Sequence, residues 1–580
     1  MFEKLLIANR GEIACRVIRS ARQMGISTVA VFSEADRDAL HVSMADEAVF
    51  IGPAPSSQSY LLIDRITEAC KTTGAQAVHP GYGFLSENPF FAAALEAQGV
   101  IFVGPPSNAI EIMGDKIASK KLADSSGVST IPGINTVIND AEEAVGYAEQ
   151  IGYPVMLKAS AGGGGKGMRI AHTADECRDG FNRATSEAQS SFGDDRIFIE
   201  KFINEPRHIE LQILADQFGN IIHLNERECS IQRRHQKVLE EAPSCFVDEA
   251  LRQVMGEQAV ALARAVGYVS AGTVEFIVDA ERNFYFLEMN TRLQVEHPVT
   301  EVVTGVDIVE KQFQIASGES IEEMKFPEKG YGLEVRVNAE KAVLDADGSV
   351  SFVPTPGEIT KCVLPEEDHI QLISMAGEGK VVSPFYDSLI IQIICYGENR
   401  NDAVNKMAEY LDRVVINGIC TNISLIKSIL RDEVFLSGEY DTGYLPAYLD
   451  RIDAEDLIRD IEEASGSVGT GLSIEMLKID DSDELKVLSP STGVFYRTPS
   501  PSEPEYVNVG DVVGADDVLC QLEAMKMFTP VNLNTFSGDD GELYAGDGRY
   551  EITRINITTG QQVNEGDLLF VIKPVVGSAK

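Results

Sequence analysis

The chain has 580 residues, 44% of them hydrophobic, and a formal net charge of −41. This length predicts several domains, and the acidity argues against a nucleic-acid partner, which requires a basic face. No apolar run approaches the length of a membrane span, so no membrane partner is expected. The nine cysteines are scattered without a C-x-x-C, which indicates neither a disulfide framework nor a zinc site.

The N-terminal part alternates predicted strands and helices. Strands at residues 5–8 and 27–32 flank a helical pattern at 11–24, and the alternation continues through 77–79 and 99–104. This pattern predicts a parallel, doubly wound sheet. The first strand follows the initial methionine without a targeting segment, which predicts a cytoplasmic protein. The strand is not followed by G-x-G-x-x-G, so no dinucleotide site is expected.

A glycine-rich loop at residues 161–167 follows a predicted strand that contains Lys158. It is not a Walker loop, because Lys166 is followed by glycine rather than serine or threonine. Its many glycines free backbone N–H groups to wrap a phosphate and let the loop close as a lid. A flexible linker is the alternative interpretation.

A predicted hairpin at residues 274–290 places two carboxylates opposite one another. A turn centred between residues 281 and 282 puts Glu275 opposite Glu288, with Asn290 on the same face. Two carboxylates and an amide on one sheet face suit Mg²⁺ bound together with substrate phosphates. A solvated strand face is the alternative, which is disfavoured because like charges paired across a ladder repel without a cation.

Polar residues alternate beyond this hairpin. If the chain stays extended, Arg292, Gln294 and Glu296 place a cation, an amide and a carboxylate just beyond the metal. That arrangement can hold a small anion and deprotonate it. The basic stretch 229–237 and Arg336 supply further local cations, which an acidic chain needs in order to bind anions.

The C-terminal region partly repeats itself at an offset of fifty residues. The matching residues are Gly510, Val513, Asp517 and Leu519, which recur as Gly560, Val563, Asp567 and Leu569. Two equivalent half-units of short strands predict a small, two-fold symmetric β-sandwich. Lys526, between Met525 and Met527, falls in the exposed connection between the halves. The alternative is a surface lysine between two packed methionines.

Long motifs over residues 1 to about 445 resemble the biotin carboxylase family. They are HPGYGFLSEN at 79–88, MGDK at 113–116, Lys158 with its glycine loop, QRRHQK at 232–237 and EMNTRLQVEHP at 288–298. The EAMKM around Lys526 is similar to the biotin-attachment site of biotin carboxyl carrier domains. The resemblance implies an α/β ATP-grasp fold with a Rossmann-like N-terminal domain, a lid and a C-terminal α+β domain, followed by an all-β biotinyl/lipoyl-type domain.

The expected domains follow the chain in order. They are a Rossmann-like domain at 1–115, an ATP-grasp lid at 116–200, the ATP-grasp and C-terminal carboxylase domain at 201–445, an acidic linker at 446–486 and the carrier at 487–577. The linker is expected to hold one short amphipathic helix near residues 456–464. About forty flexible residues would span roughly 35 Å root-mean-square.

The resemblance also implies roles for individual residues. ATP would be bound by Lys116, Lys158, Gly164, Gly165, Glu200, Lys201, Ile203, His208, Gln232 and His235. Mg²⁺ or Mn²⁺ would be held by Glu275, Glu288 and Asn290, and bicarbonate by Lys237, Arg292, Gln294 and the backbone of Val295. Glu296 would remove the proton of bicarbonate, Arg336 would stabilise the biotin enolate oxygen, Tyr82 would lie beside biotin, and Lys526 would carry biotin covalently.

The activity implied is ATP-dependent carboxylation of carrier-bound biotin by bicarbonate through carboxyphosphate. The TPSP at residues 498–501 resembles the carrier of acetyl-CoA carboxylase, and the linker is too short for the assembly domain of large acyl-CoA carboxylases. Acetyl-CoA is therefore the expected acceptor, in malonyl-CoA formation for fatty acid synthesis. The same subunit of a propionyl-CoA, other acyl-CoA or pyruvate carboxylase is the alternative.

A passive biotin-carrying scaffold is the alternative of another class, disfavoured because the chain retains Lys237, Glu288, Arg292 and Glu296. Expected partners are a separate carboxyltransferase subunit, a biotin protein ligase and a second copy of the carboxylase. Two features depart from the family. Gln392 stands where many relatives have lysine, and about a dozen extra residues lie near 536–547.

Overall fold

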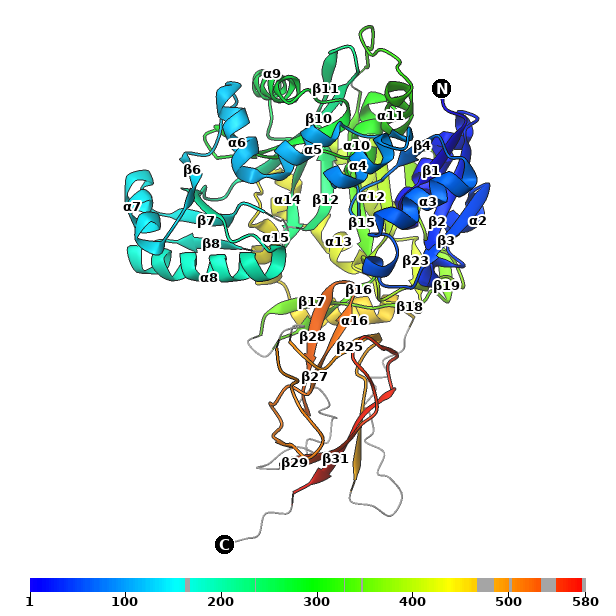
Figure 1. Ribbon diagram of the computed structural model, residues 1–580, viewed down its shortest axis with the longest axis vertical. Coiled ribbons are helices and arrows are strands. Elements are labelled where there is room, and N and C mark those ends of the chain that lie inside the picture. The colour runs from blue at the N-terminus through cyan, green and yellow to red at the C-terminus, as the bar shows by residue number, and fades with distance from the viewer. Residues whose placement is uncertain are drawn as a thin grey trace.

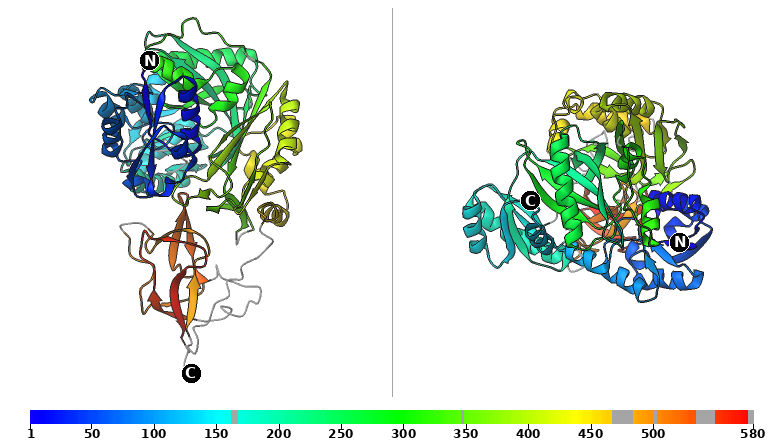
Figure 2. Two further views of the ribbon diagram at one scale, coloured as in Figure 1. Left: turned by 90° about the vertical axis from the view of Figure 1, so that its right-hand side faces the viewer. Right: turned by 90° about the horizontal axis from the view of Figure 1, so that it is seen from above.

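A computed structural model describes residues 1–161, 167–234, 236–327, 329–345, 348–466, 484–499, 503–533 and 549–575. Its larger body holds sheets of five, four and eight strands with their helices, besides three two-stranded sheets in the described residues, and a strand-rich C-terminal unit lies against one side of that body (Figures 1 and 2). Among the described residues, no helix combines the length and hydropathy that crossing a bilayer requires.

The N-terminal sheet is parallel, with strand order β3-β2-β1-β4-β5. Its strands are β1 Lys4–Ile7, β2 Ser27–Ser33, β3 Glu47–Gly52, β4 Ala77–His79 and β5 Ile101–Phe102, with helices α1 Gly11–Gln23, α3 Ile63–Thr73 and α4 Pro89–Glu96 between them. The doubly wound fold predicted from the β-α alternation is therefore confirmed.

A second, smaller sheet has the order β6-β9-β7-β8. Its strands are β6 Gly133–Ile138, β7 Val155–Ala159, β8 Met168–Ala171 and β9 Ile197–Lys201, and helices α7 Ala141–Ile151 and α8 Ala174–Phe192 pack on it. The glycine-rich stretch 162–166 between β7 and β8 lies outside the described residues.

The largest sheet has eight strands in the order β14-β13-β10-β11-β12-β15-β22-β20. They are β10 Arg207–Ala215, β11 Ile221–Arg233, β12 Gln236–Ala242, β13 Ser270–Val278, β14 Phe284–Asn290, β15 Tyr331–Asn338, β20 Ile370–Ser374 and β22 Leu389–Gly397. Helices α9 Glu249–Ala265, α10 His297–Thr304, α11 Ile308–Ala316 and α12 Arg400–Leu411 accompany it. Glu275 lies opposite Glu288 in the β13–β14 ladder, as the hairpin pattern predicts.

Two C-terminal helices of the body correct the predicted linker. Helix α15 Tyr444–Leu449 runs into the expected linker at 446–486, and helix α16 Ala454–Ala464 lies within it. Leu457 and Ile461 of α16 are 6% and 1% exposed because they join the apolar core beside the large sheet. The amphipathic helix is real, but its apolar face is buried, so residues up to 466 belong to the body.

The C-terminal unit is a sandwich of two four-stranded sheets, ordered β24-β31-β29-β26 and β28-β27-β25-β30. Its strands are β24 Leu485–Leu488, β25 Gly493–Tyr496, β26 Val512–Val513, β27 Cys520–Ala524, β28 Met527–Val531, β29 Tyr550–Ile555, β30 Gln562–Val563 and β31 Leu568–Pro574. Strands β26 and β30 stand fifty residues apart, which confirms the internal repeat. The extra residues near 536–547 lie outside the described residues.

Candidate active site

A cavity of about 1070 Å³ opens where the units of the body meet. The N-terminal unit contributes Tyr82 to its wall, the smaller sheet contributes Lys158, and the large sheet contributes Glu275. Met525 and Lys526, from the turn between β27 and β28, and Met527 at the start of β28 line the same cavity. This hairpin points from the C-terminal unit into the body (Figure 1).

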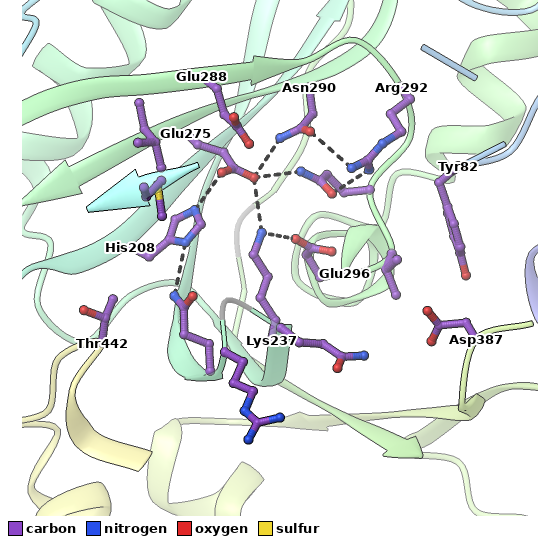
Figure 3. A pocket seen from close by; sticks show the side chains of 18 of the residues that line it. Tyr82, His208, Lys237, Glu275, Glu288, Asn290, Arg292, Glu296, Asp387 and Thr442 are labelled. Carbon is purple, nitrogen blue, oxygen red and sulfur yellow. Dashed lines mark hydrogen bonds and ion pairs between the residues drawn. The ribbon is translucent and has the colours of Figure 1, made fainter. Parts of the chain in front are cut away.

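Glu275 accepts polar contacts from several sides (Figure 3). Its Oε1 accepts hydrogen bonds from the Asn290 amide at 2.7 Å and the Gln294 amide at 3.0 Å, and His208 Nε2 lies 3.0 Å from its Oε2. Burial would raise the pKa of Glu275, but Lys237 and His208 hold it below its usual range. The carboxylate is therefore ionised at neutral pH.

The pKa of Glu288 is shifted in the opposite direction from that of Glu275. Burial and the nearby charge of Glu275 raise its pKa above the usual range. A divalent cation between these two carboxylates would relieve their repulsion, and a carboxylate pair with an amide oxygen nearby is a donor set that Mg²⁺ accepts. The residues predicted to hold a metal thus fit one.

Lys237 is buried among three carboxylates. Its Nζ lies 2.7 Å from Glu210 and 3.3 Å from Glu275, and it also pairs with Glu296. Burial opposes the charged ammonium, yet these carboxylates raise the pKa of Lys237 well above its usual value. The ammonium is a fixed positive charge at the centre of the site.

Arg292 and Gln294 lie beside this cluster but not on a strand. Strand β14 ends at Asn290 and helix α10 begins at His297, so the condition that the strand continues through residues 291–296 is not met. The segment leaves the sheet because Thr291 N–H and the Arg292 guanidinium bond Glu87 from the N-terminal unit, at 3.1 and 3.0 Å. The predicted side chains still converge, since Arg292 Nη1 donates to Gln294 Oε1 at 2.8 Å.

Glu296 lies between two cations. Lys237 contacts one of its oxygens, and Arg336 Nη2 lies 2.8 Å from the other. Burial would raise the pKa of Glu296, but Lys237, Arg336 and Arg227 hold it well below its usual range. Arg336 is in turn held by Glu240 at 2.5 Å. The backbone carbonyl of the preceding Val295 accepts from Gln392 at 2.5 Å.

Three lysines line the end of the cavity near the smaller sheet. Glu200 pairs with Lys158 and, at 2.7 Å, with Lys120. Lys116 is also in the lining, and burial lowers its pKa although Glu288 opposes this. Such a group of ammonium ions suits phosphate. Glu200 pairs with two of these lysines, so it can affect nucleotide binding by positioning their ammonium groups.

The other predicted nucleotide-binding residues are spread along the same wall. Lys201 and Ile203 line it, and the Lys201 ammonium donates to the carbonyls of Gly152 and Tyr153 at 2.9 and 3.0 Å. Gln232 Nε2 lies 3.3 Å from His208 Nδ1. The remaining members of that set, Gly164, Gly165 and His235, lie outside the described residues.

Tyr82 and Lys526 line the mouth of the cavity with Asp387. The Tyr82 hydroxyl contacts the buried carboxylate of Glu12, and Figure 3 shows the hydroxyl end of Tyr82 on the side of Asp387. Lys526 Nζ lies 4.0 Å from Asp387 Oδ2. The lysine predicted to lie in an exposed turn is 69% exposed and directed at the site.

Several residues of the site were missed by the sequence reasoning. They are Glu87, Lys120, Glu210, Glu240 and Asp387. Lys120 had a signal, because it follows Lys116 by one helical turn and shares its face. The carboxylates had none, because their partners are contributed by segments distant in sequence.

Four family models match the chain. They describe "Biotin carboxylase, N-terminal domain" at residues 1–110, "Carbamoyl-phosphate synthase L chain, ATP binding domain" at 115–324, "Biotin carboxylase C-terminal domain" at 334–447 and "Biotin-requiring enzyme" at 485–572.

Similar curated proteins include the propionyl-CoA carboxylase alpha chain of Ruegeria pomeroyi, 55% identical over 77% of this chain and 68% of that one. The human mitochondrial propionyl-CoA carboxylase alpha chain is also 55% identical, but this chain spans only 61% of its length. Biotin carboxylase 1 of Bacillus subtilis is 49% identical over 77% of this chain and 99% of its own length.

Solved structures show the same similarity. A biotin carboxylase–β,γ-ATP complex from Campylobacter jejuni has a TM-score of 0.75 and 42% identity, covering 77% of this chain and 99% of that one. The biotin carboxylase domain dimer of Hydrogenobacter thermophilus 2-oxoglutarate carboxylase, with MgADP, ADP and bicarbonate, has a TM-score of 0.73 and 45% identity, covering 77% and 98%.

Proposed function

Since the chain belongs to the biotin carboxylase family, we propose that it uses ATP and bicarbonate to carboxylate biotin attached to its own Lys526. The observation that carries this proposal is the position of the β27–β28 turn. Lys526 lines the cavity that also holds Lys237 and Glu296. Carboxylase and carrier would therefore work as one chain, with the described body as the enzyme and the C-terminal sandwich as the carrier.

The lysines at the end of the cavity near the smaller sheet would bind the phosphates of ATP. Lys116 and Lys158 supply positive charge where phosphoryl transfer develops negative charge. Glu275, Glu288 and Asn290 would hold Mg²⁺ or Mn²⁺, which supplies further charge neutralisation when bound. The Gln232–His208 contact keeps the imidazole ring oriented beside Glu275.

Bicarbonate would bind between Lys237, Arg292, Gln294 and the backbone of Val295. Glu296 would take its proton, which turns bicarbonate into a stronger nucleophile for the γ-phosphate. The three cations that hold the pKa of Glu296 low also make it a weak base. An anion that shares Lys237 would weaken this hold and raise the basicity of Glu296 when it is needed.

Biotin would supply the ureido nitrogen that accepts the carboxyl group. Arg336, fixed by Glu240 and Glu296, presents a guanidinium where negative charge would develop on the ureido oxygen. Tyr82, held by Glu12, would line the approach. The role of each residue can be tested separately by substitution.

For the acceptor, we propose acetyl-CoA, bound by a separate carboxyltransferase subunit. The TPSP stretch and the absence of room for an assembly domain between body and sandwich support this reading. Propionyl-CoA is the second candidate, favoured by the 55% identity to propionyl-CoA carboxylase alpha chains. That identity covers 77% of the chain, the share that would carboxylate biotin whatever the acceptor. A biotin protein ligase and a second copy of the chain are the other proposed partners.

The acceptor is tested on the complex purified from its native source. With labelled bicarbonate and ATP, acetyl-CoA should be carboxylated with a kcat/KM at least about tenfold above that of propionyl-CoA, since one methylene changes discrimination by roughly 10–200-fold. Malonyl-CoA and methylmalonyl-CoA are separated by chromatography. A preference for propionyl-CoA would overturn the acetyl-CoA assignment and leave the carboxylation of biotin untouched.

The metal assignment predicts the effect of Glu288→Gln. Losing this carboxylate should raise the Mg²⁺ concentration for half-maximal ATP cleavage by about 10–100-fold, in the range seen when metal sites are disturbed. Glu281→Gln, in the exposed turn of the same hairpin, is the matched control. An unchanged Mg²⁺ requirement in Glu288→Gln would place the metal elsewhere.

A further inference from the structure

The hairpin formed by β27 and β28, which we call the carrier hairpin, contacts the body at residues 383–387 between β21 Val381–Val382 and β22, which we call the receptor loop, and at the apolar core beside the large sheet. The Met525 backbone N–H donates to the Pro384 carbonyl at 2.6 Å. The Met525 side chain is 5% exposed and joins the apolar core of the body rather than that of the sandwich. A backbone bond and a buried side chain therefore join the two units.

The turn that carries these contacts has an uncommon backbone. Ala524 pairs with Met527, so Met525 and Lys526 alone form the turn, and both have positive φ, 52° and 67°. Two-residue hairpins with this geometry favour asparagine and glycine. Side chains in the left-handed region cost of order 1 kcal/mol or more each and persist where surrounding contacts fix them. Here the turn directs Met525 into the body and leaves Lys526 at the tip.

Tyr386 of the receptor loop contacts the N-terminal unit and fixes the loop to it. Its hydroxyl donates to the Ala54 carbonyl at 2.6 Å and lies 2.5 Å from Ser33 Oγ. The Arg10 guanidinium lies 4.0 Å from the centre of the Tyr386 ring and is itself fixed by two 2.7 Å contacts to Asp36. A loop held this firmly loses little freedom when the hairpin binds, which favours binding.

The contact at Asp387 cannot be the main source of recognition. The Lys526 ammonium and the Asp387 carboxylate are 4.0 Å apart and 69% and 55% exposed, and such pairs contribute about 0–1 kcal/mol. Attaching biotin converts the ammonium to a neutral amide, which removes even this attraction. The contacts of Met525 are unaffected by that modification.

We propose that the body docks the carrier hairpin at two points, the receptor loop for the Met525 backbone and the apolar core beside the large sheet for the Met525 side chain. The inference rests on the proposed function, because docking matters only if biotin on Lys526 is carboxylated in this cavity. It adds a positioning role for Met525, Pro384 and Tyr386, and it explains why a large apolar residue stands where the turn would favour asparagine.

The test compares Met525→Asn with Met525→Leu in the full-length, biotinylated chain. Asparagine suits the left-handed turn but lacks the apolar side chain, whereas leucine keeps an apolar side chain of similar size. Two rates are measured on each protein: transfer of labelled carboxyl to the attached biotin, and ATP cleavage driven by added free biotin. Intact mass gives the biotinylated fraction for normalisation.

Met525→Asn should lower the ratio of the first rate to the second by about tenfold or more, from the lost apolar burial. Met525→Leu should stay within about threefold of the native ratio, since volume-conserving swaps cost little. Phe528→Asn, on the same hairpin but 53% exposed, is the matched control. A native ratio in Met525→Asn would overturn the proposal.

Hydrogen exchange gives a reading that does not depend on activity. The backbone amide of residue 525 should be protected in the native chain and exchange at least about tenfold faster in Met525→Asn. Without the buried side chain, its hydrogen bond to the Pro384 carbonyl opens more often. Equal exchange in the two proteins would overturn docking. Failure of the native chain to cleave ATP with free biotin would instead overturn the proposed function, so the two failures are distinguishable.

Discussion

Replacing Glu296 with glutamine should slow bicarbonate-dependent ATP cleavage by about 10²–10⁴-fold, the range that a positioned general base contributes. Glutamine keeps the shape of the side chain but cannot take up the proton of bicarbonate. Its single amide oxygen can accept from Lys237 or from Arg336 but not from both, because the amide NH2 only donates. Nucleotide binding should change little, because the lysines predicted to bind phosphate come from the other end of the cavity. Steady-state ATP cleavage with and without bicarbonate, beside equilibrium nucleotide binding, measures both effects.

The control for this variant must be equally buried. Glu241 is fully buried and held by Arg400 at 2.7 Å and by Tyr331 at 2.6 Å, but it does not line the cavity. Glu241→Gln should lower stability while the folded fraction keeps its bicarbonate response. If both variants lost activity in proportion to their loss of folded protein, Glu296 would have only a structural role.

Lys237→Gln should lower both stability and activity. Its removal leaves Glu210, Glu275 and Glu296 buried without their shared ammonium, and breaking a buried ion pair costs about 3–5 kcal/mol. Removing one preorganised donor at a reaction centre lowers kcat by about 10²–10³-fold. Chemical unfolding measures the first effect, and the bicarbonate dependence of ATP cleavage measures the second.

Lys237→Arg separates these two contributions. Arginine keeps the positive charge among the carboxylates, so most of the lost stability should return. Its planar guanidinium differs in shape from the compact ammonium, so it should restore less of the rate. A Lys237→Gln protein with native stability would mean that these carboxylates are not held by Lys237. One with native bicarbonate kinetics would remove Lys237 from the anion site.

The local part of the site was predictable from sequence, because a hairpin has its register fixed by its turn. Glu275 and Glu288 lie opposite one another as the alternation indicates. The convergence of Arg292 on the site was predicted for the wrong reason. The chain leaves the strand at this point because Glu87, about two hundred residues earlier, bonds Thr291 and Arg292, and no local pattern contains that contact.

Contacts between segments distant in sequence also explain why the burial of the α16 helix and of Met525 was not predicted. The apolar stripe of α16 was visible, but a stripe does not say what covers it, so the helix was assigned to a linker. Lys526 was expected in an exposed turn and lies in one. The burial of Met525 depends on the apolar core beside the large sheet and on the Pro384 carbonyl, which only the folded body brings together.

Glu275 has a thermodynamic consequence for the order of events. Its Oε1 accepts from Asn290 and Gln294 and pairs with Lys237, so a group assigned to the metal and groups assigned to bicarbonate contact the same oxygen. If Mg²⁺ or bicarbonate changes the contacts of this carboxylate when it binds, it changes the affinity of the site for the other ligand. Linkage requires the effect to be equal in both directions. If Mg²⁺ tightens bicarbonate binding by some factor, bicarbonate tightens Mg²⁺ binding by that factor. The binding of the metal and the binding of the anion are then thermodynamically coupled.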